Sequence, residues 1–248
     1  QGYCQPTVLV LLPTRSICHE FIHGLRAHLP QQIKVKDESF DRFETEYGPP
    51  NNEDEVDDGE ALAYREKVLK TKDSEWRELF GDQVNDDDDF KIGISIHPKK
   101  PKSDGQDRCD LKLYSNFYKS DIIVASPLGL KMATTTSEGE VDADFLSSVE
   151  ICIVDRADVL LMQNWDHVTS VLGLLNSQPK KTNETDFSRV RQYALEGHSA
   201  AWRQLVIISS FMDPVMSSAI ISAKAPIVIA GLAPSDEGIT EPSAIKRF

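Results

Sequence analysis

The sequence predicts an α/β protein built on a doubly wound, mostly parallel sheet. Several short runs of apolar, often β-branched residues lack polar alternation, which is typical of strands buried on both faces of a parallel sheet. Each run is followed by apolar residues at helical spacing, and this alternation favours a sheet with helices on both faces. The strand runs are 7–12, 122–125, 151–154 and 205–208, and the helical segments after them are 16–29, 127–133, 156–175 and 214–222.

The first strand and helix illustrate the pattern. The apolar run Thr7–Leu12 is ended by Pro13. From Ser16 onward, apolar side chains recur at spacings of three and four, which predicts an amphipathic helix that stops near Pro30. A further strand is predicted at 90–96, where the residue types partly alternate. In such sheets ligands gather where the carboxyl ends of the strands open, so functional residues are expected just after each strand.

Length and composition favour one domain of this class. A chain of 248 residues with 40% apolar content can fold as one sizeable α/β domain with insertions. Its longest apolar run is far shorter than the roughly 18 to 20 residues that a membrane-spanning helix needs. The first residues lack the features of a secretory signal and look like the cut end of a longer protein.

Cysteine and histidine usage indicates no metal site. The four cysteines are scattered without a CxxC pair, which argues against a zinc cluster or a disulfide framework and fits the reduced nucleus or cytoplasm. Cys152 lies inside the apolar run ICIV, so we interpret it as a buried hydrophobic residue without a chemical role. The six histidines are not interpreted as a ligand set, and no cofactor is expected.

The negative charge is concentrated in two segments. The formal net charge is −13, which by itself argues against a protein that contacts phosphates. Residues 37–60 hold eleven acidic side chains against the single base Arg42, and Asp82 with 86–89 adds five more acids. Without these two segments the chain keeps 24 acidic and 26 basic residues, about +2. The body of the domain is therefore compatible with a nucleic-acid partner.

These segments are expected to be loops and insertions. Residues 37–60 combine acid clusters with Pro and Asn, which predicts a mobile acidic insertion. A surface helix is expected at 61–79, and loops are expected at 82–89 and 98–110. The acidic insertion could dock on basic assembly factors, or it could merely keep the domain in solution.

Short motifs follow four of the predicted strands. They are Pro13-Thr14-Arg15, Ser126-Pro127-Leu128-Gly129, Asp155-Arg156-Ala157-Asp158 and Ser209-Ser210-Phe211. Their order and spacing resemble the first RecA-like lobe of DEAD-box helicases. That lobe carries a P-loop, a PTRE-type motif, a TPGR-type motif, the DEAD tetrapeptide and a SAT motif. Four of the five positions are recognisable in this chain.

Longer strings resemble the digestive-organ-expansion-factor family, which comprises the nucleolar U3 small nucleolar RNA-associated protein 25. The strings are QGYCQPTVLVLLPTRS, FYKSDIIVASPLGL, FLSSVEICIVDRADVLLMQNWDHV, TDFSRVRQYALEGHSAAWRQLVIISSF and KRF. The resemblance implies a degenerate helicase lobe over 1–211, with 212–248 closing it and leading toward a second lobe. It also implies a nucleolar component of the small-subunit processome that acts in pre-18S rRNA processing, with pre-rRNA, U3 small nucleolar RNA and processome proteins as partners.

The resemblance to the DEAD motif also implies a loss of catalysis. No GxxxxGK[ST] string occurs in the sequence, so tight nucleotide binding is not expected. The second DEAD position, from which a Glu activates water, is Arg156, and a guanidinium cannot accept a proton. Asp155 could sit where a Mg²⁺-binding Asp would, or it could cap the next helix or pair with a neighbouring base. Asp158 is expected to hydrogen-bond to the motif at Ser209 and Ser210. No catalytic residue is expected.

Two strand ends are candidates for RNA contact. One comprises Thr14, Arg15 and Ser16, where a base and free helix amides favour a phosphate. The other comprises Ser126, Pro127, Gly129 and Lys131. The alternative is that Ser126 only caps a helix and Arg15 is only a surface base.

Three functions compete at this stage. The leading hypothesis is a non-catalytic pseudo-helicase scaffold in small-subunit assembly. The second is an RNA-dependent ATPase whose P-loop lies outside this chain. The third is a protein-interaction module without RNA contact, because a fold of this class does not fix a function.

Overall fold

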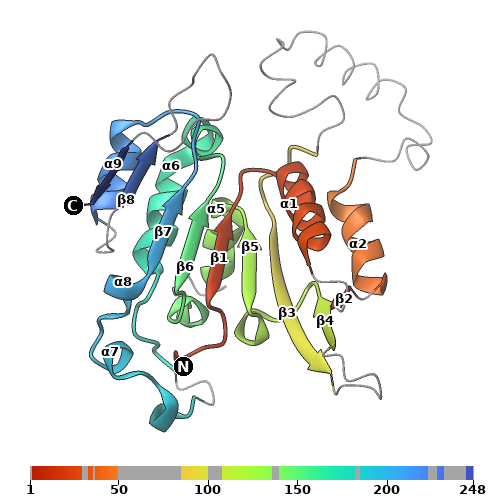
Figure 1. Cartoon of the computed structure of the whole chain (residues 1–248), viewed down its shortest axis with the longest axis horizontal. Helices are drawn as coiled ribbons and strands as arrows, with labels where there is room; N and C mark the ends of the chain where they lie inside the picture. The colour runs from red at the N-terminus through yellow and green to blue at the C-terminus, as the bar shows by residue number, and fades with distance from the viewer. Residues whose placement is uncertain are drawn as a thin grey trace.

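The computed structural model describes residues 2–29, 33–35, 37–49, 85–99, 108–135, 140–181, 185–222, 228–231 and 244–247. Within these residues, seven strands form a central sheet with the order β2-β4-β3-β5-β1-β6-β7 (Figure 1). In this sheet only β3 runs against its two neighbours, β4 and β5. The mostly parallel α/β sheet that the sequence predicts is confirmed.

The strands and helices follow the predicted alternation. The central strands are β1 (Val8–Leu11), β2 (Ile33–Val35), β3 (Lys91–Lys99), β4 (Arg108–Lys112), β5 (Ile122–Ala125), β6 (Ile151–Val154) and β7 (Gln204–Ile207), and β8 (Val228–Gly231) pairs with β9 (Ala244–Arg247) in a separate sheet. The helices are α1 (Arg15–His28), α2 (Asp37–Tyr47), α5 (Pro127–Thr134), α6 (Ala157–Leu174), α7 (Gln192–Leu195), α8 (Ser199–Trp202) and α9 (Pro214–Ser222). Single 3₁₀ turns are η1 (Phe117–Lys119), η2 (Asp144–Leu146) and η3 (Phe187–Arg189). No helix among the described residues is long and apolar enough to cross a membrane.

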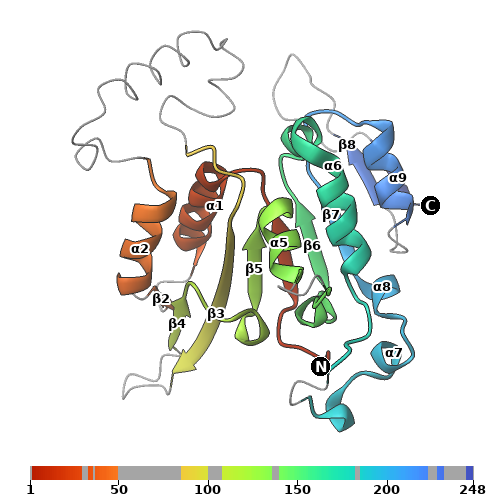
Figure 2. The same cartoon turned by 180° about the vertical axis from the view of Figure 1, so that it is seen from behind.

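The sheet is covered by helices on both faces. Because successive side chains of a strand point to opposite faces, β1 supplies two separate cores. Leu9 and Leu11 pack into the core beneath α5 and α6, whereas Val10 and Leu12 pack into the core beneath α1 and α2. Figures 1 and 2 show these helix pairs on opposite sides of the sheet. The predicted doubly wound arrangement is therefore present.

The mobile insertion predicted at 37–60 is wrong for its first part. Residues 37–47 form α2, and the Phe43 side chain is completely buried between α2, α1 and the sheet. Its ring stacks on Tyr47 with centroids 4.9 Å apart. Phe40, Phe43 and Tyr47 recur at helical spacing, so an apolar stripe anchors this otherwise acidic segment. The remainder of the predicted insertion, and the helix expected at 61–79, lie outside the described residues.

Two further expectations need correction. The loop predicted at 98–110 is partly strand, because Lys99 pairs with Arg108 in the antiparallel β3–β4 ladder. Residues 100–107 lie outside the described part of the chain. The run 205–208 was expected to be buried on both faces, yet Val206 is 41% exposed. In the described residues β7 pairs only with β6, so it forms an edge of the sheet.

Replacement of Phe43 by alanine tests the anchoring of α2. Removal of a fully buried aromatic side chain should lower the free energy of unfolding by about 3 to 5 kcal/mol. Urea denaturation of the chain measures this change. Thr45→Ala, an exposed position on the same helix, is the control and should cost less than about 0.5 kcal/mol. A loss below about 1 kcal/mol for F43A would mean that α2 is not part of the folded core.

Candidate functional site

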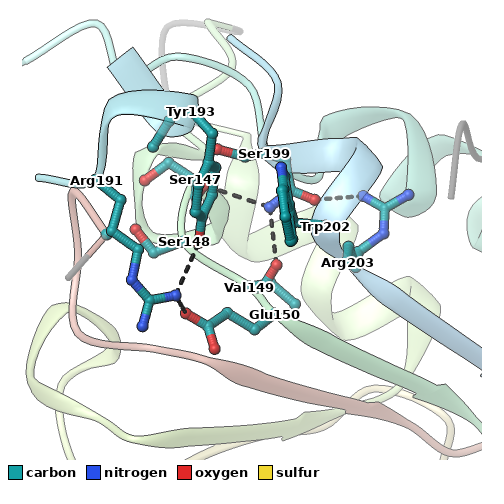
Figure 3. Close-up of a pocket in the computed structure, with 12 residues that line it drawn as sticks. Ser147, Ser148, Val149, Glu150, Arg191, Tyr193, Ser199, Trp202 and Arg203 are labelled. Atoms are coloured by element: carbon teal, nitrogen blue, oxygen red, sulfur yellow. Dashed lines mark hydrogen bonds and ion pairs between the residues drawn. The ribbon is translucent and has the colours of Figure 1, made fainter. Parts of the chain in front are cut away.

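One pocket lies at the amino end of β6, away from every motif that the sequence analysis selected. It encloses about 340 Å³ between the start of β6 and the α7–α8 segment (Figure 3). Its two arginines are engaged within the protein. Arg191 Nη1 lies 2.9 Å from Glu150 Oε1, and Arg203 Nη1 donates a 2.6 Å hydrogen bond to Asn176 Oδ1. These contacts join α7 and α8 to the sheet, so we interpret the pocket as a packing feature.

The four strand-end motifs meet at the opposite edge of the sheet. Leu11 of β1 is in register with Ala125 of β5 and with Val154 of β6, and Val154 is in register with Ile207 of β7. These four strands are parallel, so the residues that follow each of them emerge side by side. The juxtaposition expected from the sequence is confirmed by this register.

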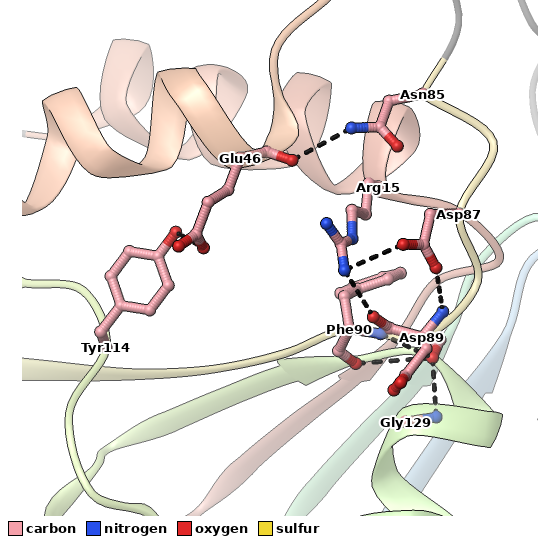
Figure 4. A network of polar contacts seen from close by, with 9 residues as sticks. Arg15, Glu46, Asn85, Asp87, Asp89, Phe90, Tyr114 and Gly129 are labelled. Carbon is pink, nitrogen blue, oxygen red and sulfur yellow. Dashed lines mark hydrogen bonds and ion pairs between the residues drawn. The ribbon is translucent and has the colours of Figure 1, made fainter. Parts of the chain in front are cut away.

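The amino end of α1 is covered by an acidic segment, residues 85–89, which we call the acidic strap (Figure 4). The backbone N–H groups of Arg15 and Ser16 donate 3.0 Å hydrogen bonds to the carbonyl oxygens of Asp87 and Asn85. These groups are among the helix-terminal donors that would otherwise face a phosphate. The strap forms the irregular part of the predicted loop 82–89, of which 82–84 lie outside the described residues.

The Arg15 side chain is also held by the strap. Its Nη2 lies 2.9 Å from Asp87 Oδ2 and donates a 3.0 Å hydrogen bond to the carbonyl oxygen of Asp89. The guanidinium lies over the Tyr47 ring at 5.5 Å, so α2 covers it from another side. The Arg15 side chain is 28% exposed and that of Asp87 is 44% exposed, so the ion pair contributes no more than about 1 kcal/mol.

Thr14 and Ser16, the other residues of this predicted RNA contact, bind each other. Thr14 Oγ1 lies 3.0 Å from Ser16 Oγ, and Thr14 is 2% exposed. The prediction that Thr14, Arg15 and Ser16 present free donors to RNA is therefore wrong for the described structure. Contact with a phosphate there requires displacement of the acidic strap.

The second predicted RNA contact is largely internal. Ser126 is completely buried, and its Oγ accepts a 2.9 Å hydrogen bond from the Gly129 N–H, so it caps α5. Pro127 occupies the first turn of α5 and is buried. Gly129 passes so close to β3 that a Cβ atom would collide with the Phe90 carbonyl oxygen. The capping alternative for Ser126 is confirmed, and these three side chains are unavailable to RNA.

Lys131 and a neighbouring cleft remain accessible at this edge. Lys131 Nζ lies 3.2 Å from His167 Nδ1 on α6. A cleft of about 330 Å³ lies between α5 and α6, and it is lined by Asp88, Ser126, Pro127, Leu128, Leu160, Gln163, Asn164 and His167. Helix α6 is kinked at Asn164, whose Oδ1 accepts a 3.1 Å hydrogen bond from the Asp166 N–H and so restarts the helix. The three α6 polar residues were not selected from the sequence, although they lie in the string DRADVLLMQNWDHV.

Asp155 and Arg156 form the turn between β6 and α6. Asp155 Oδ1 accepts a 2.8 Å hydrogen bond from the Arg156 N–H. Arg156 has a left-handed backbone with φ 51° and ψ 47°, a conformation that costs a non-glycine residue roughly 1 to 2 kcal/mol. The Ala157 N–H donates to the Ile208 carbonyl oxygen at 2.9 Å, which fixes the turn against the end of β7. Of the two sequence alternatives for Asp155, the geometry supports the capping role.

Asp158 and Ser210 join the two degenerate motifs. Ser210 Oγ donates a 2.8 Å hydrogen bond to Asp158 Oδ2, and Asp158 is 4% exposed. The hydrogen bond expected between Asp158 and the Ser209-Ser210 motif is confirmed. Ser209 Oγ is buried without a hydrogen-bond partner, whereas Phe211 is 51% exposed. The contact spans β6, α6 and the segment after β7, so it acts as a latch between these elements.

Cys152 has no part in this edge. Its side chain is completely buried, and burial raises the pKa of the thiol to about 12, so it stays protonated at neutral pH. The interpretation of Cys152 as a core residue is confirmed.

The fold and the motif edge define the chain as a domain of the NTP hydrolase-like class. The family model described as UTP25, NTP hydrolase-like domain, matches residues 1–227. The chain belongs to the UTP25 family, which confirms the resemblance found in the sequence strings.

Several relatives share this domain. Protein NUCLEOLAR FACTOR 1 of Arabidopsis thaliana is 39% identical over 223 residues, which cover 88% of this chain and 28% of that protein. The U3 small nucleolar RNA-associated protein 25 of Podospora anserina is 41% identical over 222 residues, with 88% and 29% covered. That of Pyricularia oryzae is 39% identical over 218 residues, with 88% and 26% covered. The chain thus spans less than a third of the length of these relatives.

A double-mutant cycle tests the latch. Asp158→Ala and Ser210→Ala each remove one partner of a buried hydrogen bond to a carboxylate. We expect a coupling energy of about 1.5 kcal/mol or more in the free energy of unfolding. The exposed pair Asp186 and Ser188, which has a 2.6 Å hydrogen bond of the same kind, is the matched control and should couple by less than about 0.5 kcal/mol. Equal coupling in the two pairs would refute the latch.

Proposed function

We propose that this chain is a non-catalytic, RecA-like helicase lobe of a nucleolar protein that acts in assembly of the small-subunit processome and in pre-18S rRNA processing. The nucleolar site and the link to U3 small nucleolar RNA are supported by the names of the relatives, which are a nucleolar factor and U3 small nucleolar RNA-associated proteins. The helicase-like assignment is supported by the four ordered motifs at one edge of a doubly wound sheet.

The observation that carries the non-catalytic assignment is the position of Arg156. It directly follows Asp155 at the carboxyl end of β6, where the resemblance places the residue that activates water. Activation of water needs a group that accepts a proton, and a guanidinium stays protonated and has no acceptor lone pair. Its permanent positive charge beside Asp155 also disfavours a bound Mg²⁺.

A magnesium nucleotide, which the NTP hydrolase-like class implies, does not fit the residues at this edge. Asp155 places one carboxylate oxygen on the Arg156 N–H, and the nearest helix amino end, that of α1, is covered by acidic side chains and carbonyl oxygens. Both features repel a triphosphate or leave it without donors. We therefore assign no catalytic step to this domain.

The conserved carboxyl edge serves as a scaffold in this proposal. Asp158 holds α6 to the segment after β7, and Ser126 fixes α5 to β3. A rigid edge of this kind presents the cleft between α5 and α6, with Lys131 and His167, to RNA or to an assembly factor. RNA contact through Arg15 belongs to a second state, in which the acidic strap has moved away.

An ATPase assay tests the loss of catalysis. The full-length protein that carries this domain, with and without structured RNA, should show no turnover above the level of its Asp155→Ala variant. Arg156→Glu, which restores a carboxylate at the degenerate position, is a second comparison and should remain inactive because the nucleotide is not gripped. RNA-stimulated turnover that Asp155→Ala abolishes would overturn the proposal and favour an RNA-dependent ATPase.

An RNA-binding measurement tests the role of the strap. Asp87→Ala removes the carboxylate that pairs with Arg15, so affinity for single-stranded RNA should rise by about fivefold, the equivalent of about 1 kcal/mol. Fluorescence anisotropy at one fixed salt concentration gives the dissociation constants. Glu196→Ala, which makes the same change in net charge far from α1, is the matched control.

The second substitution in that experiment is Arg15→Ala. In the Asp87→Ala background it should return the affinity to the parental value. An equal gain from Glu196→Ala, or no loss from Arg15→Ala, would show that Arg15 does not contact RNA and would favour a protein-interaction module.

A further inference from the structure

Two histidines and a glutamate converge between α1 and α2. His19 Nε2 lies 2.8 Å from Glu44 Oε2, and His23 Nε2 lies 2.8 Å from Glu44 Oε1. The two imidazole nitrogens are themselves 3.1 Å apart. All three ligand atoms therefore lie within reach of one metal ion, and among the described residues these three side chains form the one such group. Figure 1 shows the two helices side by side on one face of the sheet.

The sequence carries a signal for this cluster that the absence of an expected ligand set passed over. His19-Glu20-Phe21-Ile22-His23 has the spacing HExxH, which places two imidazoles on one face of a helix, one turn apart. Such a pair needs a third ligand from elsewhere, and no local pattern marks Glu44 as that ligand. The packing of α2 against α1 brings it there. The expectation that the histidines form no ligand set is corrected by this geometry.

Aromatic residues of α2 hold the two imidazoles in place. The Phe43 ring stacks on His19 with centroids 5.6 Å apart and an interplanar angle of 16°. The Phe40 ring meets His23 edge to face at 5.3 Å. Both phenylalanines belong to the helix that carries Glu44, so one element sets the positions of all three ligand atoms. Preorganisation of this kind is what a binding site requires.

Protons alone do not satisfy this cluster. Each contact between an imidazole nitrogen and the ionised carboxylate is favourable only if that nitrogen carries a hydrogen. The contact between the two nitrogens is favourable only if one of them lacks it. With Glu44 ionised, no assignment of protons meets all three conditions at once. A divalent cation, which accepts lone pairs from all three groups, meets them together.

The state of Glu44 agrees with this argument. Burial by itself would raise the pKa of its carboxyl, but the hydrogen bond and charge of His19, together with those of His23, hold the pKa below its ordinary value. Glu44 is therefore a carboxylate at neutral pH. Its Oε1 is buried and has no partner with hydrogen-bond geometry, although it lies 2.8 Å from His23 Nε2. A buried acceptor aimed at a group of ligand atoms is a second, independent indication of a cation.

We propose that His19, His23 and Glu44 bind a divalent first-row transition ion, with Zn²⁺ as the ion that fits best. Two imidazole nitrogens and one carboxylate oxygen form a borderline ligand set that suits Zn²⁺ better than Mg²⁺ or Ca²⁺. Three protein ligands leave one position of a tetrahedral ion for water. The three side chains are 19%, 42% and 39% exposed, so an ion can enter from solvent.

The ion would clamp α2 to α1 beside the acidic strap. Asn85 Nδ2 donates a 3.0 Å hydrogen bond to the Glu46 carbonyl oxygen, so the strap is attached to α2 two residues beyond the ligand Glu44. The loss of the ion would loosen the helix on which the strap rests. The site is thus structural and stands independently of the function proposed above.

Metal binding by the purified chain tests the proposal. After removal of metal with a chelator, Zn²⁺ titration in competition with a chromophoric chelator should give one ion per chain. His23→Ala and Glu44→Gln should each weaken binding at least 100-fold, since each removes a direct ligand. His28→Ala, on the same helix but outside the cluster, is the matched control and should bind as the parent does. Co²⁺ in place of Zn²⁺ should give a visible absorption band of tetrahedral type.

Thermal unfolding with chelator present separates folding from binding. Glu44→Gln keeps the side-chain shape, so its Tm without metal should stay within a few degrees of the parental value. Saturating Zn²⁺ should raise the Tm of the parent and of His28→Ala, and leave that of Glu44→Gln unchanged. A parent chain that binds no Zn²⁺, or folded variants that bind it as tightly as the parent, would overturn the proposal.

Discussion

The parallel, in-register pairing of β1 with β5 and β6 is the constraint on which the rest of this structure depends. Leu11 lies opposite both Ala125 and Val154, so the turns after three strands open at the same edge. That edge collects the four motifs that the sequence places far apart. The alternating side chains of β1 also feed the two cores beneath the two helix layers. A shift of one residue would exchange these cores and separate the motifs.

The acidic strap explains how a strongly negative chain keeps a helicase-like edge intact. The first turn of α1 offers unpaired N–H groups and a guanidinium, which are the features of an anion site. Here the chain supplies the acceptors itself, through Asp87 and its neighbours. The negative charge is therefore not only a solvating surface. Part of it satisfies a positive site inside the fold.

The degenerate motifs have kept their packing and changed their charge. Asp158 and Ser210 still connect β6, α6 and the end of β7 by a buried hydrogen bond. Arg156 follows the same turn in a left-handed conformation, with its N–H bound to Asp155. The geometry of the edge and its chemistry are thus separable, because hydrogen bonds between elements need no proton acceptor of the catalytic type. This separation is consistent with a lobe that serves as a scaffold.

The sequence by itself determined the bounds of β5, β6 and α9, the alternation of strands and helices, and the charge at Arg156, because local periodicity and residue chemistry encode these features. Only the tertiary structure decided that Asp87 covers Arg15, that α2 is anchored through Phe43, that β7 is an edge strand, and that Glu44 meets His19 and His23. Each of these depends on a contact between segments distant in the chain. Such contacts are set by how the helices pack on the sheet, and spacing along a single segment does not specify them.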